Sequence, residues 1–246
     1  MTQTKHWFLV PSMHDPFYVC GGMQIFMHMH ELVSKLRSAE IITYRHLEDG
    51  YRYLDDIPSD ELGTGVLWVT WQSHIIELAK RLSAYSNVVL YAQAEDFGRD
   101  QGQVTPIQWP IVCLSRYIAA DYSVRDPGRL VLYHGTAVNP GARNAGIDRD
   151  LDVLVHKRKS VPYLFHELVP ALQEKMTVEI VDQFINQADY FSLLNRTKTY
   201  LYWFHKTNWG TYEGFGMQPL EAILCGSIPV SNFYGGLSDY LEAPFN

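Results

Sequence analysis

The chain has 246 residues, 47% of them hydrophobic and 13% aromatic, which excludes a disordered or fibrous protein. Its net charge of −7 is shared evenly between the two halves, with no basic half or tail, so we expect no nucleic-acid partner. No apolar run reaches the roughly 20 residues of a membrane span, and Pro11 interrupts the first apolar run too early for a signal peptide. The three cysteines form neither a disulfide pattern nor a zinc pattern, which is typical of a cytoplasmic protein in a reducing compartment.

Short apolar runs alternate with longer amphipathic ones along the first half, a pattern that predicts an α/β domain with a parallel sheet. A glycine turn at Gly21 and Gly22 opens the first expected helix, over 20–38, and apolar residues at helical spacing predict another over 72–86. Strands are expected at 6–12, 39–47, 65–71, 87–93, 110–115 and 128–135.

Residues 136–150 are rich in Gly, Asn, Asp and Pro without periodicity, which indicates a linker. The alternation of strands and helices restarts after it. Strands are expected at 151–156, 176–182, 199–204 and 228–232, and helices at 161–175, 185–198 and 218–226. We therefore predict two successive α/β domains, an N-terminal one over residues 1–138 and a C-terminal one over residues 139–246.

The stretch TYEGFGMQPLEAILCGSIPV, residues 211–230, sets two carboxylates around a glycine turn and a short helix. Gly214 and Gly216 let the backbone approach a ligand, and their amides with those of the helix start would form an anion site. Glu213 is expected at a strand's carboxyl end and Glu221 in the first helical turn, where carboxylates suit sugar and ribose hydroxyls beside a phosphate. Alternatively, Glu221 only stabilises the helix dipole and Glu213 is a solvated loop residue.

Pro219 and Gly226 bracket a helix of about two turns in this stretch, because proline suits the first turn and glycine the position just past the end. The dinucleotide fingerprint G-x-G-x-x-G is incomplete, since Pro219 stands where its third glycine belongs. An NAD-dependent Rossmann enzyme is therefore a weaker alternative, also because no acidic residue is suitably placed after the first glycine turn of the chain.

The stretch EGFGMQPLEAILCGSIPVSNFYGG, residues 213–236, resembles the signature of the family 4 (group 1) retaining glycosyltransferases, in which two glutamates are spaced as E-x7-E. The resemblance implies the GT-B architecture, two Rossmann-like domains facing each other across a cleft that holds a nucleotide-sugar. It implies a catalytic Glu213 that contacts hydroxyls of the donor sugar, and a Glu221 that binds the ribose of the nucleotide. The residues between them that it assigns to substrate binding are Gly214, Phe215, Gly216 and Met217.

A run of three basic residues, Lys157, Arg158 and Lys159, follows the strand expected at 151–156. Family members carry an Arg and a Lys near this place, so the resemblance implies that the run neutralises the donor diphosphate and stabilises the departing nucleotide. Arg158 and Lys159 would then be catalytic and Lys157 would bind substrate; the alternative is a solvated basic loop. Neither a metal nor another cofactor is expected, because basic side chains and helix N-termini take the place of a metal in enzymes of this kind.

The N-terminal half resembles the family less closely. Gly21 and Gly22 match the glycine loop that lines the cleft, although they alternatively form only a turn after the first strand. Gln93 ends a strand at the place where many members carry a histidine beside the reacting sugar, which puts a histidine-based role in doubt. We assign Gln93 to substrate binding and regard His74 and His134 as structural.

The family normally continues with further α/β units beyond the point where this sequence ends, so we expect a shortened C-terminal domain that is minimal, truncated or completed by a partner. The expected function is retaining transfer of a sugar from a nucleotide-diphosphate-sugar to an unknown glycan or lipid-linked acceptor, in glycan or polysaccharide biosynthesis. The alternative is a non-catalytic nucleotide-sugar-binding protein that needs a partner or a missing segment. Peripheral membrane contact and the oligomeric state stay open.

Overall fold

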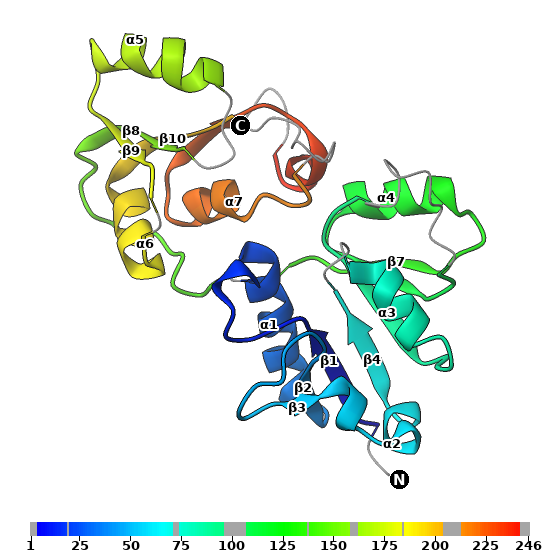
Figure 1. The fold of residues 1–246 in the computed structure, drawn as a ribbon. Helices are drawn as coiled ribbons and strands as arrows, with labels where there is room; N and C mark the ends of the chain where they lie inside the picture. The colour runs from blue at the N-terminus through cyan, green and yellow to red at the C-terminus, as the bar shows by residue number, and fades with distance from the viewer. Residues whose placement is uncertain are drawn as a thin grey trace. The chain divides into compact units, whose positions relative to one another are not determined.

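The computed structural model describes residues 4–18, 20–70, 74–95, 107–136, 138–157, 162–183, 185–203 and 213–241 of the chain. The chain divides into two compact units, Met1–Ala137 and Val138–Asn246, which we call unit 1 and unit 2 (Figure 1). Each unit contains one sheet, and all the described strand pairs in both sheets are parallel. Of the helices in the described ranges, none combines the length and the apolar character needed to cross a membrane.

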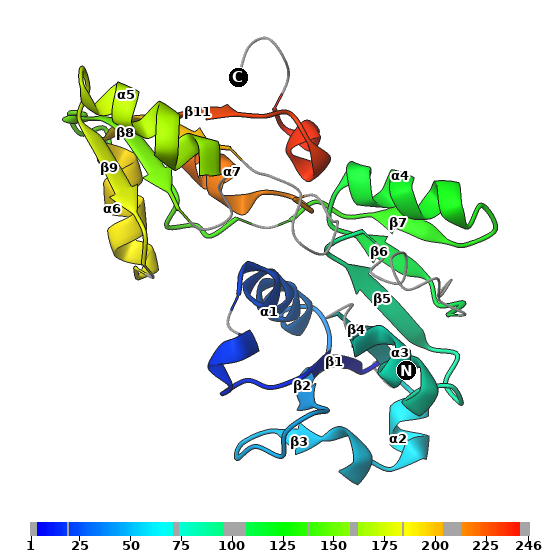
Figure 2. The same cartoon turned by 45° about the horizontal axis from the view of Figure 1, so that its top comes forward.

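Unit 1 is built around a seven-stranded sheet in the order β3-β2-β1-β4-β5-β6-β7 (Figure 2). The chain starts at β1 inside the sheet, runs outward to β3 and then crosses to β4 on the other side of β1. The strands are β1 His6–Val10, β2 Ala39–Thr43, β3 Arg52–Tyr53, β4 Val66–Val69, β5 Val88–Ala92, β6 Ile111–Cys113 and β7 Val131–Tyr133. The helical segments are η1 Pro16–Tyr18, α1 Gly21–Ser34, η2 Leu54–Asp56, α2 Ser59–Gly63, α3 Ile75–Arg81 and α4 Arg116–Arg125.

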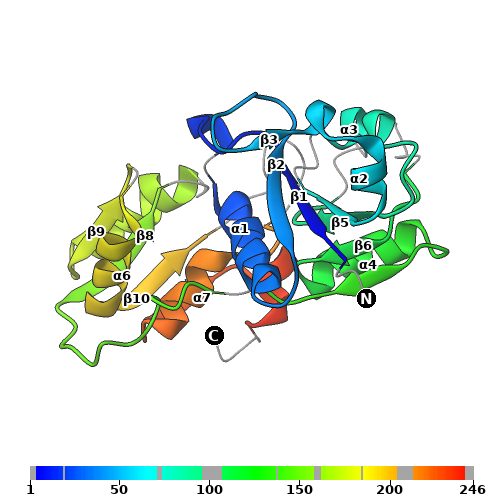
Figure 3. The same cartoon turned by 90° about the horizontal axis from the view of Figure 1, so that it is seen from below.

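The core of unit 1 forms around β1, whose apolar run Trp7–Val10 is completely buried. Strands of parallel sheets are usually buried on both faces, which is why this strand is apolar at successive positions and does not alternate. Helix α1 runs beside β1 and β2 (Figure 3). Its Phe26 lies on the sheet, with ring centroids 5.1 Å from Phe8 of β1 and 5.9 Å from Tyr91 of β5.

Unit 2 contains a four-stranded sheet in the order β11-β10-β8-β9. After β8 the chain adds β9 on one side, and it then crosses to β10 on the other side of β8. The strands are β8 Leu151–His156, β9 Val178–Val181, β10 Thr197–Tyr202 and β11 Ile228–Ser231. The helical segments are a π turn, η5 Leu164–Leu168, which continues into α5 Val169–Gln173, then α6 Gln187–Arg196, α7 Met217–Leu224 and the 3-10 segment η6 Gly235–Asp239.

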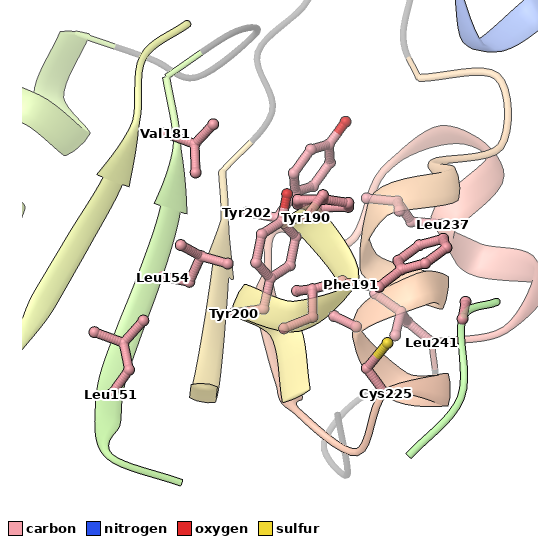
Figure 4. Close-up of a cluster of buried hydrophobic side chains, with 13 residues drawn as sticks. Leu151, Leu154, Val181, Tyr190, Phe191, Tyr200, Tyr202, Cys225, Leu237 and Leu241 are labelled. Carbon is pink, nitrogen blue, oxygen red and sulfur yellow. The ribbon is translucent and has the colours of Figure 1, made fainter. Parts of the chain in front are cut away.

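Two hydrophobic clusters line the two faces of the unit 2 sheet, because successive side chains of a strand point to opposite faces. Tyr200 and Tyr202 of β10 belong to the cluster that also contains residues of α6 and α7 (Figure 4). Leu201, between them, belongs to the other cluster, with residues of η5 and α5. The face of β10 that carries Tyr200 and Tyr202 is the one next to the motif predicted within residues 211–230.

The segment predicted as a linker packs onto unit 2 over much of its length. The Arg149 guanidinium donates to three main-chain carbonyl oxygens near the ends of α6 and α7, where a cation is also favoured by the helix dipoles. The acceptors are those of Leu194 (3.1 Å), Thr197 and Cys225 (2.7 Å). In addition, the Ala145 amide donates to Oδ1 of the buried Asn195 at 2.6 Å.

We predict that Arg149→Met lowers the free energy of unfolding of unit 2 by roughly 1–3 kcal/mol, because the buried Cys225 carbonyl loses its donor, whereas the carbonyls of Leu194 and Thr197 still accept from the Ser227 hydroxyl. Urea unfolding followed by circular dichroism measures the change. Arg196→Met is the matched control, since that guanidinium pairs with Asp150 at the surface, where both side chains are about half exposed. A change for Arg149→Met no larger than that of the control would contradict the prediction.

Candidate functional site

The carboxyl ends of β8 and β10 flank the place where the strand order of the unit 2 sheet reverses. Open α/β sheets bind their ligands outside the carboxyl ends of the strands at such a place. Lys157 directly follows β8, and Tyr202 is the last residue of β10. The Tyr202 hydroxyl hydrogen-bonds to Glu213, so the motif predicted from the sequence lies at this edge of the sheet.

The turn before α7 depends on a glycine at position 216. Gly216 has φ of 80° and forms the N-cap of α7, a conformation that side chains disfavour. A Cβ atom on Gly216 would also lie 2.4 Å from Cδ2 of Leu237 and 2.9 Å from the Tyr240 hydroxyl oxygen. Both the backbone conformation and the space around it therefore require glycine, as the motif predicts. The first amides of α7 have no acceptor within the helix, which makes the helix start suitable for an anion.

The helix that follows has the predicted length and the predicted end. Gly226 has φ of 83° just past the last turn of α7, and its amide donates to the carbonyl oxygen of Ile223 at 2.9 Å. The Ser227 amide donates to the carbonyl oxygen of Ala222 at 2.9 Å, which completes a Schellman motif. One expectation is wrong: α7 begins at Met217 and has no acidic residue in its first turn, so Glu221 lies in the second turn. A dipole role for Glu221 is weakened accordingly, since that effect fades within the first turn.

Glu221 is a buried carboxyl group, with 8% of its surface exposed. Loss of contact with water raises its pKa to about 7. Among the described residues, none donates a hydrogen bond to this carboxyl group or forms an ion pair with it. An isolated buried carboxylate is costly unless something pairs with it. The side chain therefore has the properties of a group that a ligand with hydroxyl groups would satisfy.

Glu213 lies in a different environment, although the two residues belong to one turn-helix element. Its side chain is half-buried, and Oε2 accepts a hydrogen bond of 2.7 Å from the Tyr202 hydroxyl. Its main-chain oxygen accepts a hydrogen bond of 2.8 Å from the Gly236 amide. The three residues after it, Gly214 to Gly216, are buried. Glu213 is thus fixed at both its side chain and its main chain.

Three buried tyrosines, Tyr190, Tyr200 and Tyr202, form the core next to the motif (Figure 4). The rings of Tyr200 and Tyr202 stack with centroids 6.1 Å apart. Burial raises the pKa of all three phenols, so each keeps its proton at neutral pH. The hydroxyls of Tyr190 and Tyr200 influence each other's ionisation, but neither makes a hydrogen bond of ordinary geometry with a described residue. The Tyr202 hydroxyl differs, because it reaches Glu213.

Gln93 and Gly22, both predicted to bind substrate, lie together at the carboxyl edge of the unit 1 sheet. Gln93 follows β5, and its Nε2 donates to the main-chain oxygen of Gly22 at 2.9 Å. A Cβ atom on Gly22 would lie 2.3 Å from Oε1 of Gln93, whereas a Cβ atom on Gly21 would meet nothing within 4 Å. The amide of Gln93 therefore holds the start of α1, and Gly21 is the residue of the pair that has open space in front of it.

Two histidines of unit 1, His74 and His134, were suggested by the sequence to be structural. The Tyr44 hydroxyl lies 3.0 Å from Nδ1 of His74, and burial lowers the pKa of this imidazole. The His134 amide donates to the Cys113 carbonyl oxygen at 2.9 Å and so extends the pairing of the last two strands. Within the described ranges, no group of three or more His, Cys, Asp and Glu side chains is arranged to hold a metal ion.

The basic run is described only at its first residue. Lys157 is exposed, and its amide donates to the Val181 carbonyl oxygen at 2.9 Å, which fixes its backbone beside the end of β9. Arg158 and Lys159 lie outside the described residues, so their predicted catalytic roles stay predictions. The remaining predicted residues divide between the units, with Gly21, Gly22 and Gln93 in unit 1 and the motif residues in unit 2.

Tyr202 and Tyr240 contact the motif but were not predicted from the sequence. Tyr202 lies in an apolar strand, where a tyrosine indicates core packing and nothing more. The Tyr240 hydroxyl donates to the main-chain oxygen of Gly216, from a segment more than 20 residues further along the chain. Gly236 was visible as the last residue of the glycosyltransferase-like signature, and a Cβ atom there would lie 2.0 Å from the Gly214 carbonyl oxygen.

No protein-family model matches the chain, and no curated protein matches its sequence. Its fold is similar to that of the DNA modifying enzyme β-glucosyltransferase, solved in the presence and absence of uridine diphosphoglucose, at 10% identity and a TM-score of 0.55 over 93% of this chain and 79% of that one. A structure of T4 phage β-glucosyltransferase gives 9% identity and a TM-score of 0.56 over 93% and 80%. At such identities the likeness concerns the fold. The predicted α/β class with GT-B-like parallel sheets is confirmed.

The expectation of no nucleic-acid partner is wrong, because a protein with this fold is a DNA modifying enzyme. The expectation rested on a net charge summed over the whole chain, and such a sum does not report the charge on a single face. Membership of family 4 stays a prediction, as no family model matches.

We predict that Glu221 makes unit 2 less stable as the pH rises. The folded chain holds this proton more tightly than the unfolded chain, so the favourable contribution is complete below about pH 4.5 and is lost as the pH passes about 7. Between these limits the free energy of unfolding of the wild type should fall by roughly 3 kcal/mol relative to that of Glu221→Gln. Urea unfolding at several pH values measures the difference.

The exposed Glu174 provides the control for this comparison. Glu174→Gln should follow the wild type at every pH. Parallel curves for the wild type and Glu221→Gln would show that Glu221 ionises normally in the folded chain.

Proposed function

We propose that the chain is a glycosyltransferase that uses a nucleotide-diphosphate-sugar as donor. The observation that carries the proposal is the buried Glu221 carboxyl group, which has no described partner and lies one turn into a helix that begins at a glycine turn. A carboxylate needs donors, the helix start favours an anion, and the sheet edge is a usual ligand position. A nucleotide-sugar offers hydroxyls and a diphosphate at once. The GT-B-like fold supports the same conclusion.

The roles follow the resemblance to family 4 and the chemistry of each group. Glu221 would accept hydrogen bonds from the ribose, and Glu213 from hydroxyls of the donor sugar. The amides at the start of α7 would bind the diphosphate, with the basic run that begins at Lys157 stabilising the charge that develops on it. Uridine is the first nucleotide to test, because a solved structure of similar fold was determined with uridine diphosphoglucose.

In the reaction we propose, the acceptor oxygen forms a bond to the anomeric carbon while the bond from that carbon to the diphosphate breaks. The acceptor proton passes to the departing phosphate oxygen, so no protein nucleophile is required and the configuration is retained. Arg158 and Lys159 would stabilise the leaving group. The proposal needs no metal ion, as the cationic side chains and the helix amides supply the positive charge.

Two acceptor classes follow from two different observations. The fold shared with a DNA modifying enzyme favours a hydroxyl carried on DNA. The E-x7-E motif favours a glycan hydroxyl, free or lipid-linked. A chain that binds the nucleotide-sugar and neither hydrolyses nor transfers it would instead be a binding protein.

We predict that the wild type binds UDP-glucose and that Glu221→Ala weakens this binding at least tenfold, because paired hydroxyls lose a charged acceptor. Isothermal titration calorimetry measures both. The variant removes a buried charge, so it should not unfold unit 2, and loss of binding then reports the site. Glu174→Ala, at an exposed position, should bind like the wild type. If neither UDP-glucose nor other nucleotide-sugars bind, the donor site does not exist.

The acceptor is identified by incubating the protein with UDP-glucose labelled with carbon-13. Two acceptors are compared, a DNA duplex that carries an added hydroxyl group and a panel of glycans. We expect transfer to one class, with the anomeric configuration of the donor preserved in the product, and NMR of the anomeric carbon reads both results. Inversion would refute the front-face mechanism while leaving the transferase activity intact.

A further inference from the structure

The Glu213 carboxylate is held by a phenol that belongs to the core. Tyr202 is 2% exposed and donates a hydrogen bond of 2.7 Å to Oε2 of Glu213. Its ring is locked by stacking on Tyr200, with an angle of 21° between the planes. A phenol fixed in this way presents its hydroxyl in one direction, and a charge-assisted hydrogen bond of this length is among the stronger kinds.

The main chain of the same turn is held from a second direction, by residues 235–240. The Gly236 amide donates to the Glu213 carbonyl oxygen at 2.8 Å. Gly236 approaches the Gly214 carbonyl so closely that no side chain fits between them. The Tyr240 hydroxyl donates to the Gly216 carbonyl oxygen, and the Tyr240 ring lies 5.2 Å from that of Phe215. The main chain of the turn is thus held independently of the hydrogen bond that Tyr202 makes to the Glu213 side chain.

We infer that Tyr202 is a positioning residue that sets the orientation of the Glu213 carboxylate for the donor sugar. The inference rests on the proposed function, in which Glu213 contacts the sugar hydroxyls. Ordering a glutamate side chain on binding costs conformational entropy, and prior fixation by Tyr202 reduces that cost. A catalytic group must also be held within a fraction of an ångström of its productive position.

A purely structural role for the Tyr202 hydroxyl predicts different experimental results. Phenylalanine at position 202 would fill the same space in the core and stack on Tyr200 equally well. The hydroxyl is what reaches the carboxylate at the surface of that core. A structural role predicts that its removal affects the folding of unit 2 and the binding of every ligand alike. A positioning role predicts an effect confined to ligands that carry the sugar.

The test compares UDP with UDP-glucose in the full-length chain, with the wild type and Tyr202→Phe. We expect UDP to bind both proteins with affinities within twofold, because UDP lacks the sugar. The affinity for UDP-glucose should fall roughly 3- to 10-fold in the variant. Tyr200→Phe is the matched control, since that phenol is equally buried and its hydroxyl makes no hydrogen bond of ordinary geometry with a described residue. It should bind both ligands like the wild type.

A second variant tests whether Tyr202 acts through Glu213. Glu213→Ala alone should weaken binding of UDP-glucose, and adding Tyr202→Phe to it should cause little further loss, because the group being positioned is already absent. Additive losses would overturn the inference.

The single-variant results overturn it in two further ways, either by an equal loss for UDP and UDP-glucose or by no loss for either. Failure of the wild type to bind UDP-glucose is a different result, because it removes the donor site itself. Thermal unfolding of each variant shows that the comparison is made on folded protein.

Discussion

The burial of one carboxyl group that has no partner among the described residues is the constraint on which the candidate donor site depends. Glu221 is held there by α7, which the Schellman motif at Gly226 ends and the left-handed Gly216 begins. The helix is only two turns long, so these two glycines determine how deeply the carboxyl group is buried. A sequence free to change would replace such a group by an apolar one or pair it with a cation. A buried carboxyl group with no partner among the described residues is explained if a ligand supplies the missing donors.

The strand order of each sheet decides where the chemistry gathers. In unit 2 the reversal lies between β8 and β10, and Lys157 and Tyr202 stand at the ends of these two strands. In unit 1 the reversal lies between β1 and β4, and the glycine turn that follows β1 is held by Gln93. The same topological rule thus acts twice, but with different residues. Unit 2 has carboxylates beside a helix start, which suits a ligand that carries hydroxyls next to an anion. In unit 1 the side-chain amide of Gln93 instead hydrogen-bonds to the glycine turn.

Much of this could be predicted from local sequence, and the failures have physical causes. Short apolar runs predicted the described strands except the two-residue β3, because buried parallel strands need no alternation. Glycines at 216 and 226 predicted the turns, since their φ values are positive. Glu221 was placed one turn too early, because a proline at 219 suggested a later helix start than Met217. The bond between Gln93 and Gly22 joins residues 71 positions apart, and no local pattern encodes it. Net charge alone could not exclude a nucleic-acid partner, because binding depends on how the charge is distributed over the surface.

The two glutamates of the motif show how one short element can carry two roles. Glu221 is buried, and its pKa of about 7 leaves it partly protonated at neutral pH. Glu213 is half-buried, and it accepts a hydrogen bond from a phenol that burial keeps protonated. Groups that differ in this way are suited to different tasks in one site. The helix fixes the depth of Glu221 and the core tyrosine fixes the orientation of Glu213, so the packing of unit 2 controls both.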